Sequence, residues 1–370
     1  MKKKINIVDY LGAHCGMHYY LEAMKKVIAG AGDFDVNIMS NFSPTPSAPA
    51  FFKNQYQGSK LKKGLSLLTN LTRLKKYVAR HPAEIYIYLT YGNHIDVPFI
   101  NIISKAPFHL VDIHEVIAQN LDTNQGLKNK FRNQYASRIK SVISHSSRTD
   151  DFLREFGFSG SRLSVPHFRY VFPRQFDAAA IPEEIKNAPA KDKINLLFFG
   201  NLNENKGIDI LMDAINRLDE STASKLNLIV AGKDFDGSVD RVPLKDHRIA
   251  HIFKRHISDD ELRFLYQNAD YLCLPYRKTS QSGILEMAFY FKKPIIASDL
   301  PYFRTTLEEF PSFGILTGIG AQEYADALKK VVEDHGKKDF YTEADYSSYE
   351  NRKEIEDFKG DFNTFVNSLK

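Results

Sequence analysis

The sequence predicts an α/β protein made of two domains, each a doubly wound, mostly parallel sheet covered by helices. The chain has 370 residues, of which 43% are hydrophobic, enough to fill two cores. Short apolar stretches alternate with amphipathic helical stretches along most of its length, as in parallel sheets. A segment rich in Ala, Pro and charge, residues 171–190, interrupts this alternation and has no sustained apolar period.

Six strands are expected before this segment and six after it. The expected strands are residues 5–10, 35–40, 84–91, 108–114, 140–144, 162–167, 194–200, 226–232, 250–254, 271–276, 293–298 and 313–317. The most clearly amphipathic helices are expected at residues 17–30, 147–157, 207–218, 258–269, 282–291 and 321–334. We therefore expect an amino-terminal domain over residues 1–170, a linker over 171–190, a carboxyl-terminal domain over 191–345 and a helical tail over 346–370.

The sequence contains no signal for export or membrane insertion that we can identify. Lys2 to Lys4 are basic, but Asp9 breaks the apolar run that follows before it reaches the length of a signal peptide. No stretch of eighteen apolar residues occurs. Cys15 and Cys273 are the only cysteines, which excludes a disulfide framework and a Cys-x-x-Cys metal site and fits a reducing compartment. These features predict a cytoplasmic protein.

Positive charge is concentrated in the first half of the chain. Residues 1–170 hold 23 Lys or Arg against 12 Asp or Glu, so the net charge of +5 conceals a basic half and an acidic half. Much of the excess lies in residues 58–80, where five leucines recur at helical spacing among cations. Such a helix suits the surface of an anionic membrane, but a leucine stripe facing a core under solvated lysines is an equally good interpretation. A second basic stretch, residues 127–140, favours an anionic surface, and no nucleic-acid signature is present.

The loop after the expected strand 194–200 predicts an anion site. Gly200 closes the strand, and Lys206 and Gly207 stand at the start of the next helix. A helix amino terminus offers unpaired N–H groups and a partial positive charge, and a lysine beside it adds a full charge for phosphate. The alternative is a solvated lysine at a helix start.

The loop and helix after the expected strand 271–276 predict a second half of the same site. Glu286 is the one acid in the apolar helix "GILEMAFYF", where an unpaired carboxylate would be costly. Capping is one explanation, but Gly283 rather than Ser or Thr stands three positions earlier. A vicinal diol of a ribose or sugar is a better partner for the two carboxylate oxygens. The N–H groups near Ser282, Gly283 and Ile284 would then bind a diphosphate.

These two stretches resemble a known family. "FFGNLNENKGIDILMDAI" and "ISDDELRFLYQNADYLCLPYRKTSQSGILEMAFYFKKPIIASDLP" resemble the donor-binding half of retaining GT-B glycosyltransferases, in particular glycosyltransferase family 4. The resemblance implies two Rossmann-like domains facing across a cleft, with the final helix returning to the first domain. It assigns Lys206 to the donor phosphates, Glu286 to the ribose and Ser282 with Gly283 to the diphosphate. The nucleotide base would lie near Arg255 and His256.

The sequence departs from the family pattern at two positions. Asn201 stands where the family commonly has an arginine, so one cation for the leaving diphosphate is missing, and Lys278 or Arg277 could replace it. Lys278 also stands where the family often has a first glutamate that contacts the donor sugar. The second departure leaves the identity of the donor sugar open.

The first domain is expected to supply the acceptor side. Gly12 and Gly16 resemble the glycine-bearing loop of the family near the donor, with His14 and His18 as acceptor-side candidates. His114 resembles the histidine of the family near the transferred sugar, and Glu115 lies beside it. His14, Cys15 and His18 have the chemistry of metal ligands but no second cluster, and the triplet Asp234 to Asp236 resembles a metal motif of another fold, so no metal is expected.

The sequence therefore predicts a retaining, hexosyltransferase-type enzyme that moves a sugar from a UDP- or GDP-sugar to a surface glycan or lipid-linked glycan. Lys206 would stabilise the leaving diphosphate and His114 would lie near the sugar. Two alternatives remain open at this point. One is a GT-B nucleotide-sugar epimerase, and the other is a catalytically silent GT-B partner in polysaccharide assembly. Binding of NAD alone would indicate an oxidoreductase.

Overall fold

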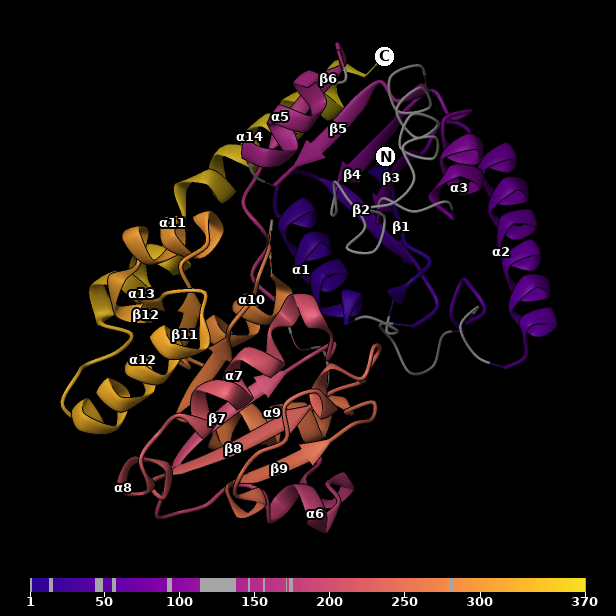
Figure 1. Cartoon of the computed structure of the whole chain (residues 1–370). Coiled ribbons are helices and arrows are strands. Elements are labelled where there is room, and N and C mark those ends of the chain that lie inside the picture. The colour runs from indigo at the N-terminus through magenta and orange to yellow at the C-terminus, as the bar shows by residue number, and fades with distance from the viewer. Residues whose placement is uncertain are drawn as a thin grey trace. The chain divides into compact units, whose positions relative to one another are not determined.

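The structure is a computed structural model of the whole chain (Figure 1). It describes all residues except 1, 13–15, 44–48, 55–57, 92–94, 114–137, 146, 156, 171, 173–175, 280, 281 and 370. The chain divides into two compact units. The first unit comprises Met1–Pro173 and Arg352–Lys370, and the second comprises Arg174–Asn351.

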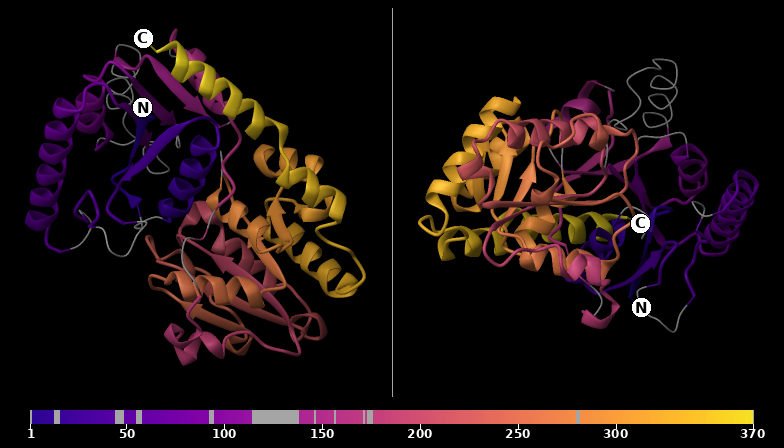
Figure 2. Two further views of the ribbon diagram at one scale, coloured as in Figure 1. Left: turned by 180° about the vertical axis from the view of Figure 1, so that it is seen from behind. Right: turned by 60° about the horizontal axis from the view of Figure 1, so that its bottom comes forward.

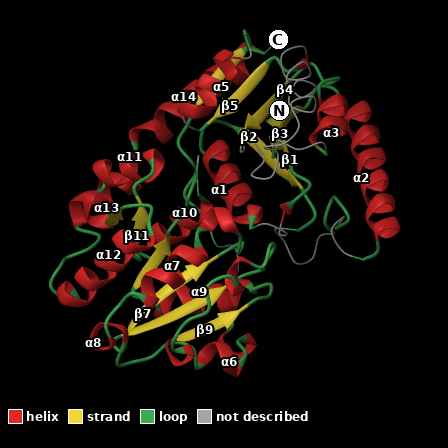
Figure 3. Cartoon of the chain, viewed as in Figure 1, coloured by secondary structure: helices red, strands yellow, loops and turns green. Residues whose placement is uncertain are grey.

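Each unit is built on one parallel sheet of six strands (Figure 3). The strands of the first unit are β1 (Lys3–Val8), β2 (Phe34–Met39), β3 (Ile85–Thr90), β4 (His109–Ile113), β5 (Ser141–Ser144) and β6 (Ser161–Ser164). Those of the second are β7 (Ile194–Phe199), β8 (Leu226–Ala231), β9 (Ala250–Phe253), β10 (Tyr271–Leu274), β11 (Ile295–Ser298) and β12 (Gly314–Thr317). Each of the twelve strands predicted from the sequence is present, because runs of buried β-branched and aromatic residues mark parallel strands covered on both faces.

The order of strands differs between the two sheets. It is β2-β1-β3-β4-β5-β6 in the first unit and β12-β11-β10-β7-β8-β9 in the second. The direction of chain progression reverses between β1 and β3 in the first sheet and between β7 and β10 in the second. These reversals are topological switch points, where loops diverge beyond the carboxyl ends of the strands and leave room for a ligand.

Helices cover both faces of the sheets (Figure 1). In the first unit they are α1 (Met17–Ala29), α2 (Lys60–Arg80), α3 (Asp96–Ile103), α5 (Ser147–Glu155) and α14 (Lys353–Ser368). In the second they are α6 (Glu183–Lys186), α7 (Ile208–Asn216), α8 (Glu220–Ala223), α9 (Asp259–Asn268), α10 (Gly283–Tyr290), α11 (Pro301–Glu309), α12 (Ala321–Asp334) and α13 (Glu343–Glu350). Short 3-10 turns join some of them, including η3 (Glu204–Lys206) and η6 (Pro311–Phe313).

The predicted helical tail is two helices that belong to different units. Helix α13 ends at Glu350 in the second unit, and α14 begins at Lys353 and belongs to the first. The yellow α14 lies along the first unit in both views of Figure 2. Phe358 of α14 packs against Phe168, and Phe362 against Phe34, so two aromatic contacts hold this helix. Helix α6 lies inside the stretch for which the sequence predicted a linker.

The helix predicted from the basic stretch is present as α2, but its leucines do not form one buried face. Leu74 is fully buried, whereas Leu61, Leu65 and Leu68 are 75%, 56% and 61% exposed. The interpretation of a leucine stripe facing the core is therefore wrong for the first half of the helix. Side chains advance about 100° per residue, so the steps of three residues from Leu65 to Leu74 rotate the stripe around the helix.

Candidate functional site: the carboxyl edge of the second sheet

The switch point of the second sheet is formed by the loops that follow β7 and β10. Gly200 ends β7 with φ of 117°, and a Cβ there would lie 3.2 Å from Cδ1 of Ile284 in α10. Gly207 begins α7 with φ of 71°, and a Cβ there would lie 1.8 Å from the carbonyl oxygen of Pro275. The loop after β7 therefore approaches the loop and helix after β10 closely, and glycine makes both approaches possible.

Lys206 lies where these loops meet. It is the last residue of η3. The side chain of Asn203, the N-cap of this turn, accepts from the Lys206 N–H at 3.1 Å. The Lys206 Nζ lies 3.8 Å from the centre of the Tyr276 ring. Among the described residues no carboxylate pairs with this ammonium, and the buried hydroxyl of Tyr276 has no hydrogen-bond partner. An ammonium without a carboxylate partner at a switch point has the chemistry to bind an anion.

An ion pair fixes the same two loops. Arg277 donates to both oxygens of Asp209, at 2.8 and 2.6 Å, from the loop after β10 to the first turn of α7. Burial opposes ionisation of Asp209, but the hydrogen bonds from Arg277 outweigh it, so the pKa of Asp209 lies below its ordinary value. Asn205 also donates to the Lys278 carbonyl at 3.1 Å. Arg277 is thus paired with Asp209, whereas Lys278 beside it is exposed.

The amino terminus of α10 is the second half of the site. Ser282 is its N-cap residue, but its side chain makes no capping hydrogen bond. The Ser282 Oγ is buried, with the residue 3% exposed, and has no partner among the described residues. The N–H groups of Gly283 and Ile284 are in the first turn and have no partner within the helix. A buried serine hydroxyl and unpaired N–H groups at a helix start are typical of an anion site, because each would otherwise carry a desolvation cost.

Glu286 is buried as expected, but it has a partner that the sequence did not reveal. The Tyr349 hydroxyl, in α13, donates to the Glu286 Oε2 at 2.7 Å, and Glu286 is 2% exposed. Phe289, one turn along the same face of α10, packs against Tyr349 at 5.2 Å. The N-cap is Ser282, so Glu286 is the fourth helical residue and the capping explanation fails.

Ile284 lies on another face of α10. It contacts Gly200, and Phe291, two turns along, packs against Tyr266 at 5.1 Å. Glu286 is two residues from Ile284, about 200° around the helix. The carboxylate therefore faces α13 while Ile284 faces the loop after β7, and the ribose role of Glu286 stays a prediction without support from this geometry.

The other residues predicted to bind the donor lie at the same edge of the sheet. Some are exposed, and one is already paired with carboxylates of the protein. Asn201 is exposed directly after Gly200, and His256 is exposed in the loop after β9. Arg255 donates to Glu261 at 2.6 Å and to Glu184 at 2.7 Å, and these hydrogen bonds raise its pKa. Glu261 is also the acidic half of a capping box with Ser258 at the start of α9. Arg255 therefore stabilises the local structure of this loop.

No metal cluster is present among the described residues, counted as three or more His, Cys, Asp or Glu side chains that could share an ion. The Asp234 to Asp236 triplet is used locally. Asp234 accepts from the N–H groups of Asp236 and Gly237, and Asp236 accepts from the N–H of Glu204 at 2.9 Å. These contacts join the loops after β8 and β7.

The switch point of the first sheet is organised by Asp9. This fully buried carboxylate accepts from the N–H groups of Leu11 and Gly12, at 3.1 and 2.5 Å, and from the hydroxyls of Ser40 and Tyr91, at 3.1 and 2.5 Å. Burial raises the pKa of Asp9 although these hydrogen bonds oppose the rise. One carboxylate thus joins the loops after β1, β2 and β3.

The predicted residues of the first unit are only partly described. Gly16 is the N-cap of α1 with φ of 72°, and His18 is buried in α1 with its ring against Tyr19 and Phe42. His14, His114 and Glu115 lie outside the described residues, so their roles stay predictions.

A buried polar cluster lies just before His114 in the chain. Asp112 of β4 accepts from the Tyr20 hydroxyl at 2.6 Å and pairs with His145 Nε2 at 2.9 Å. Burial lowers the pKa of His145, but the charge of Asp112 more than compensates, so the pKa of His145 is raised. Burial lowers the pKa of the neighbouring His167 to about 3. This cluster ties α1 to β4 and to the residues that follow β5.

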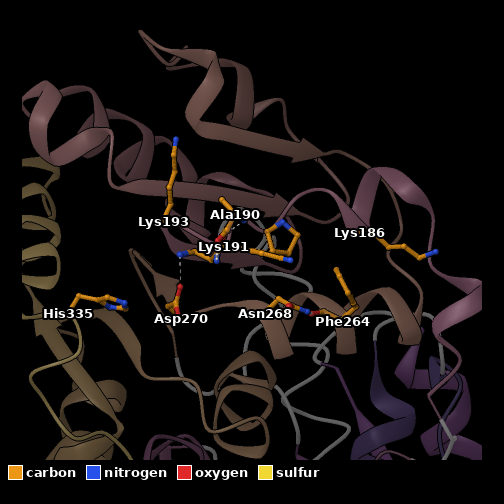
Figure 4. Close-up of a pocket in the computed structure, with 10 residues that line it drawn as sticks. Lys186, Ala190, Lys191, Lys193, Phe264, Asn268, Asp270 and His335 are labelled. Atoms are coloured by element: carbon orange, nitrogen blue, oxygen red, sulfur yellow. Dashed lines mark hydrogen bonds between the residues drawn. The ribbon is translucent and has the colours of Figure 1, made fainter.

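A cavity of about 380 Å³ lies at the opposite edge of the second sheet. Its lining includes Lys193 and Asp270, which immediately precede β7 and β10, so it is at the amino ends of the strands. Figure 4 shows Lys186 and Lys193 pointing in different directions, and Asp270 accepts from the Asn195 N–H at 2.7 Å. Diverging lysines and a carboxylate engaged by the backbone do not form an anion site.

The fold, two parallel α/β sheets of six strands each, is that of a GT-B protein. Residues 181–348 match the family described as Glycosyl transferases group 1, so the second unit is a domain of this family. No curated protein matches the chain.

Solved structures support the fold over the whole chain. Sucrose-phosphate synthase from Thermosynechococcus elongatus is similar with a TM-score of 0.72 and 15% identity, covering 100% of this chain and 99% of that one. HepE of Anabaena in complex with UDP has a TM-score of 0.64 and 16% identity, covering all of both chains. WaaG, a glycosyltransferase involved in lipopolysaccharide biosynthesis, has a TM-score of 0.64 and 13% identity, covering 98% and 100%.

Proposed function

We propose that the protein is a retaining glycosyltransferase that transfers a sugar from a nucleoside diphosphate to a glycan acceptor. The observation that carries the proposal is the pair of unsatisfied groups at one switch point, the ammonium of Lys206 and the buried hydroxyl of Ser282 at the start of α10. Both have the chemistry to bind a diphosphate. They lie in the unit that belongs to the Glycosyl transferases group 1 family.

In this proposal the chain acts mainly on the leaving group. The bond between the anomeric carbon and the diphosphate oxygen breaks, the acceptor hydroxyl oxygen bonds to that carbon and gives up its proton, and negative charge grows on the departing diphosphate. Lys206 and the N–H groups of Gly283 and Ile284 would stabilise that charge from fixed positions, which lowers the barrier without reorganisation. The Arg277 and Asp209 pair would keep the two loops in register during the step.

UDP is the first nucleotide to consider, since the HepE structures hold UDP, UDP with glucose, and UDP-glucose. We propose a hexose as the sugar and a surface glycan, free or lipid-linked, as the acceptor. WaaG, which has the same fold, is involved in lipopolysaccharide biosynthesis. His114 is proposed to lie near the transferred sugar, with Glu115, His14 and His18 on the acceptor side.

The proposal is tested by following a panel of UDP- and GDP-sugars by NMR with and without acceptor glycans. We expect nucleoside diphosphate release from one donor, a product with the anomeric configuration of that donor, and loss of both in Lys206→Ala. Epimerised donor without any acceptor would identify an epimerase instead. A folded protein that binds no nucleotide and turns over no donor would overturn the proposal and favour a silent partner.

A further inference from the structure

Helix α2 presents an apolar stripe to solvent. Leu61, Leu65 and Leu68 share one face of the helix, since they are spaced by four and three residues. They are more than half exposed, and they are the only three exposed large hydrophobic residues in the described part of the first unit. The helix lies at the periphery of this unit, with α3 beside it (Figure 1, Figure 2).

The opposite face of α2 is held by the rest of the unit. Leu74 and Val78 are buried, and Asn70 exchanges two hydrogen bonds with the backbone of Lys53, at 2.8 and 2.9 Å. On a helical projection the centres of the anchored face and of the leucine stripe lie about 150° apart. The leucines are therefore directed away from the core by a helix that is itself firmly anchored.

The charged side chains of α2 are all positive. The helix contains seven cations and no acid: Lys60, Lys62, Lys63, Arg73, Lys75, Lys76 and Arg80. The exposed Lys62, Lys75 and Lys76 flank the leucines on a helical projection. Long lysine side chains can reach phosphate groups while the leucines between them enter the acyl region.

We infer that α2 is a docking surface for an anionic lipid bilayer, with Leu61, Leu65 and Leu68 inserted and the flanking lysines on the headgroups. A second copy of this chain fits less well. A two-fold interface pairs the same surface with itself, which would bring the cations of both copies together with no acid on α2 to neutralise them. Within the described ranges, the structure has no helix that could span a bilayer.

The test is sedimentation of the full chain with vesicles of phosphatidylcholine alone and of phosphatidylcholine with phosphatidylglycerol in equal parts. We expect binding only to the anionic vesicles, weakened by salt because exposed charges are screened. Each cation near the surface is worth about fivefold in affinity, so K62E/K75E/K76E, which replaces three cations by acids, should weaken binding by at least about 100-fold. L61S/L65S/L68S should weaken it by at least about tenfold, because inserted methylene groups are lost.

Two matched variants in exposed positions away from α2 control for charge and for apolar surface. K225E/K330E/K353E removes the same charge, and I252S/I319S removes exposed apolar side chains of the second unit. Both should bind vesicles as the wild type does. Equal binding by L61S/L65S/L68S and wild type, or no binding to anionic vesicles, would overturn the inference.

A leucine-dependent dimer in analytical ultracentrifugation would overturn it as well, in favour of the second copy. UDP binding measured on the same samples separates this inference from the proposed function. The inference on α2 predicts unchanged UDP binding in all four variants, and a wild type that does not bind UDP would contradict only the proposed function.

Discussion

The two sheets differ in whether the polar groups at their switch points have partners within their own unit. In the first unit Asp9 is buried and accepts four hydrogen bonds from three loops of its own unit. In the second unit Lys206 has no carboxylate partner and the Ser282 hydroxyl has no hydrogen-bond partner among the described residues. This difference separates the polar groups that stabilise the fold from those that are candidates for ligand binding. A buried polar group with partners inside the protein holds loops together. A polar group without such partners at a switch point is available to bind a ligand.

The largest effect is expected from removing the structural carboxylate. Asp9→Ala leaves two N–H groups and two hydroxyls without their acceptor, and each unsatisfied buried donor is costly. We expect the free energy of unfolding of the first unit to fall by about 3 kcal/mol. Urea unfolding measures this loss, and Asp35→Ala, an exposed strand position, should change stability little. An unchanged urea midpoint for Asp9→Ala would show that this carboxylate does not stabilise the first unit.

Removing Lys206 should weaken ligand binding and leave the stability of the folded protein almost unchanged. Lys206→Ala should weaken UDP binding by about 30-fold, because a point charge on the diphosphate is lost. The thermal midpoint without nucleotide should move little, since among the described residues the Lys206 side chain contacts the Tyr276 ring and forms no ion pair. Calorimetric titration with UDP gives the affinities, and Lys225→Ala serves as a control. A Lys206 variant that is destabilised but binds UDP normally would place this lysine with the structural residues.

Glu286 tests the same distinction, because the sequence predicts a ribose contact for its carboxylate and the structure shows its Oε2 accepting from Tyr349. Tyr349→Phe removes the donor to a buried carboxylate, and we expect a loss of about 1 to 2 kcal/mol in stability. Glu286→Gln keeps an acceptor for Tyr349, so UDP affinity should stay within about threefold of the wild type. A large loss of UDP affinity in a folded Glu286→Gln protein would show that the carboxylate reaches the nucleotide after all.

The smallest effect is a pH dependence confined to the first unit. The pKa of His145 is raised in the folded state by Asp112, so the folded protein holds a proton that the unfolded chain releases first. Its stabilising contribution is complete below the ordinary histidine pKa and is lost as pH rises through the folded value. The difference in free energy of urea unfolding between wild type and His145→Gln should be larger at pH 6 than at pH 8.5 by about 1 kcal/mol or less, and the opposite contribution of His167, whose pKa burial lowers, is common to both proteins. A stability that rises with pH in the wild type alone would contradict the sign.

Local pattern predicted the parts of the molecule that depend on local interactions. Apolar runs located all twelve strands, and the position of Lys206 after β7 followed from the alternation of strand and helix. The partner of Glu286 could not be predicted, because Tyr349 lies 63 residues away and nothing in its helix marks it. In the sequence Asp9 only interrupts an apolar run. Its role could not be predicted, because its partners come from three separate loops.

The orientation of α2 shows a different limit of sequence patterns. The spacing of its leucines is helical, but three successive steps of three residues rotate the stripe by about 180°. The pattern therefore could not say which leucines face the core. The exposed fractions decide it, with Leu74 inside and Leu61, Leu65 and Leu68 outside.

The carboxyl edge of the second sheet is proposed to bind a nucleoside diphosphate through Lys206 and the start of α10. The most direct test of this claim is thermal unfolding of wild type and Lys206→Ala with UDP, GDP, ADP, CMP and NAD. A ligand at a hundred times its dissociation constant stabilises the folded state by about 2.7 kcal/mol. We predict that one nucleoside diphosphate raises the midpoint of the wild type and that this shift shrinks in the variant. No shift with any nucleotide, a shift with NAD alone, or an equal shift in Lys206→Ala would contradict the claim.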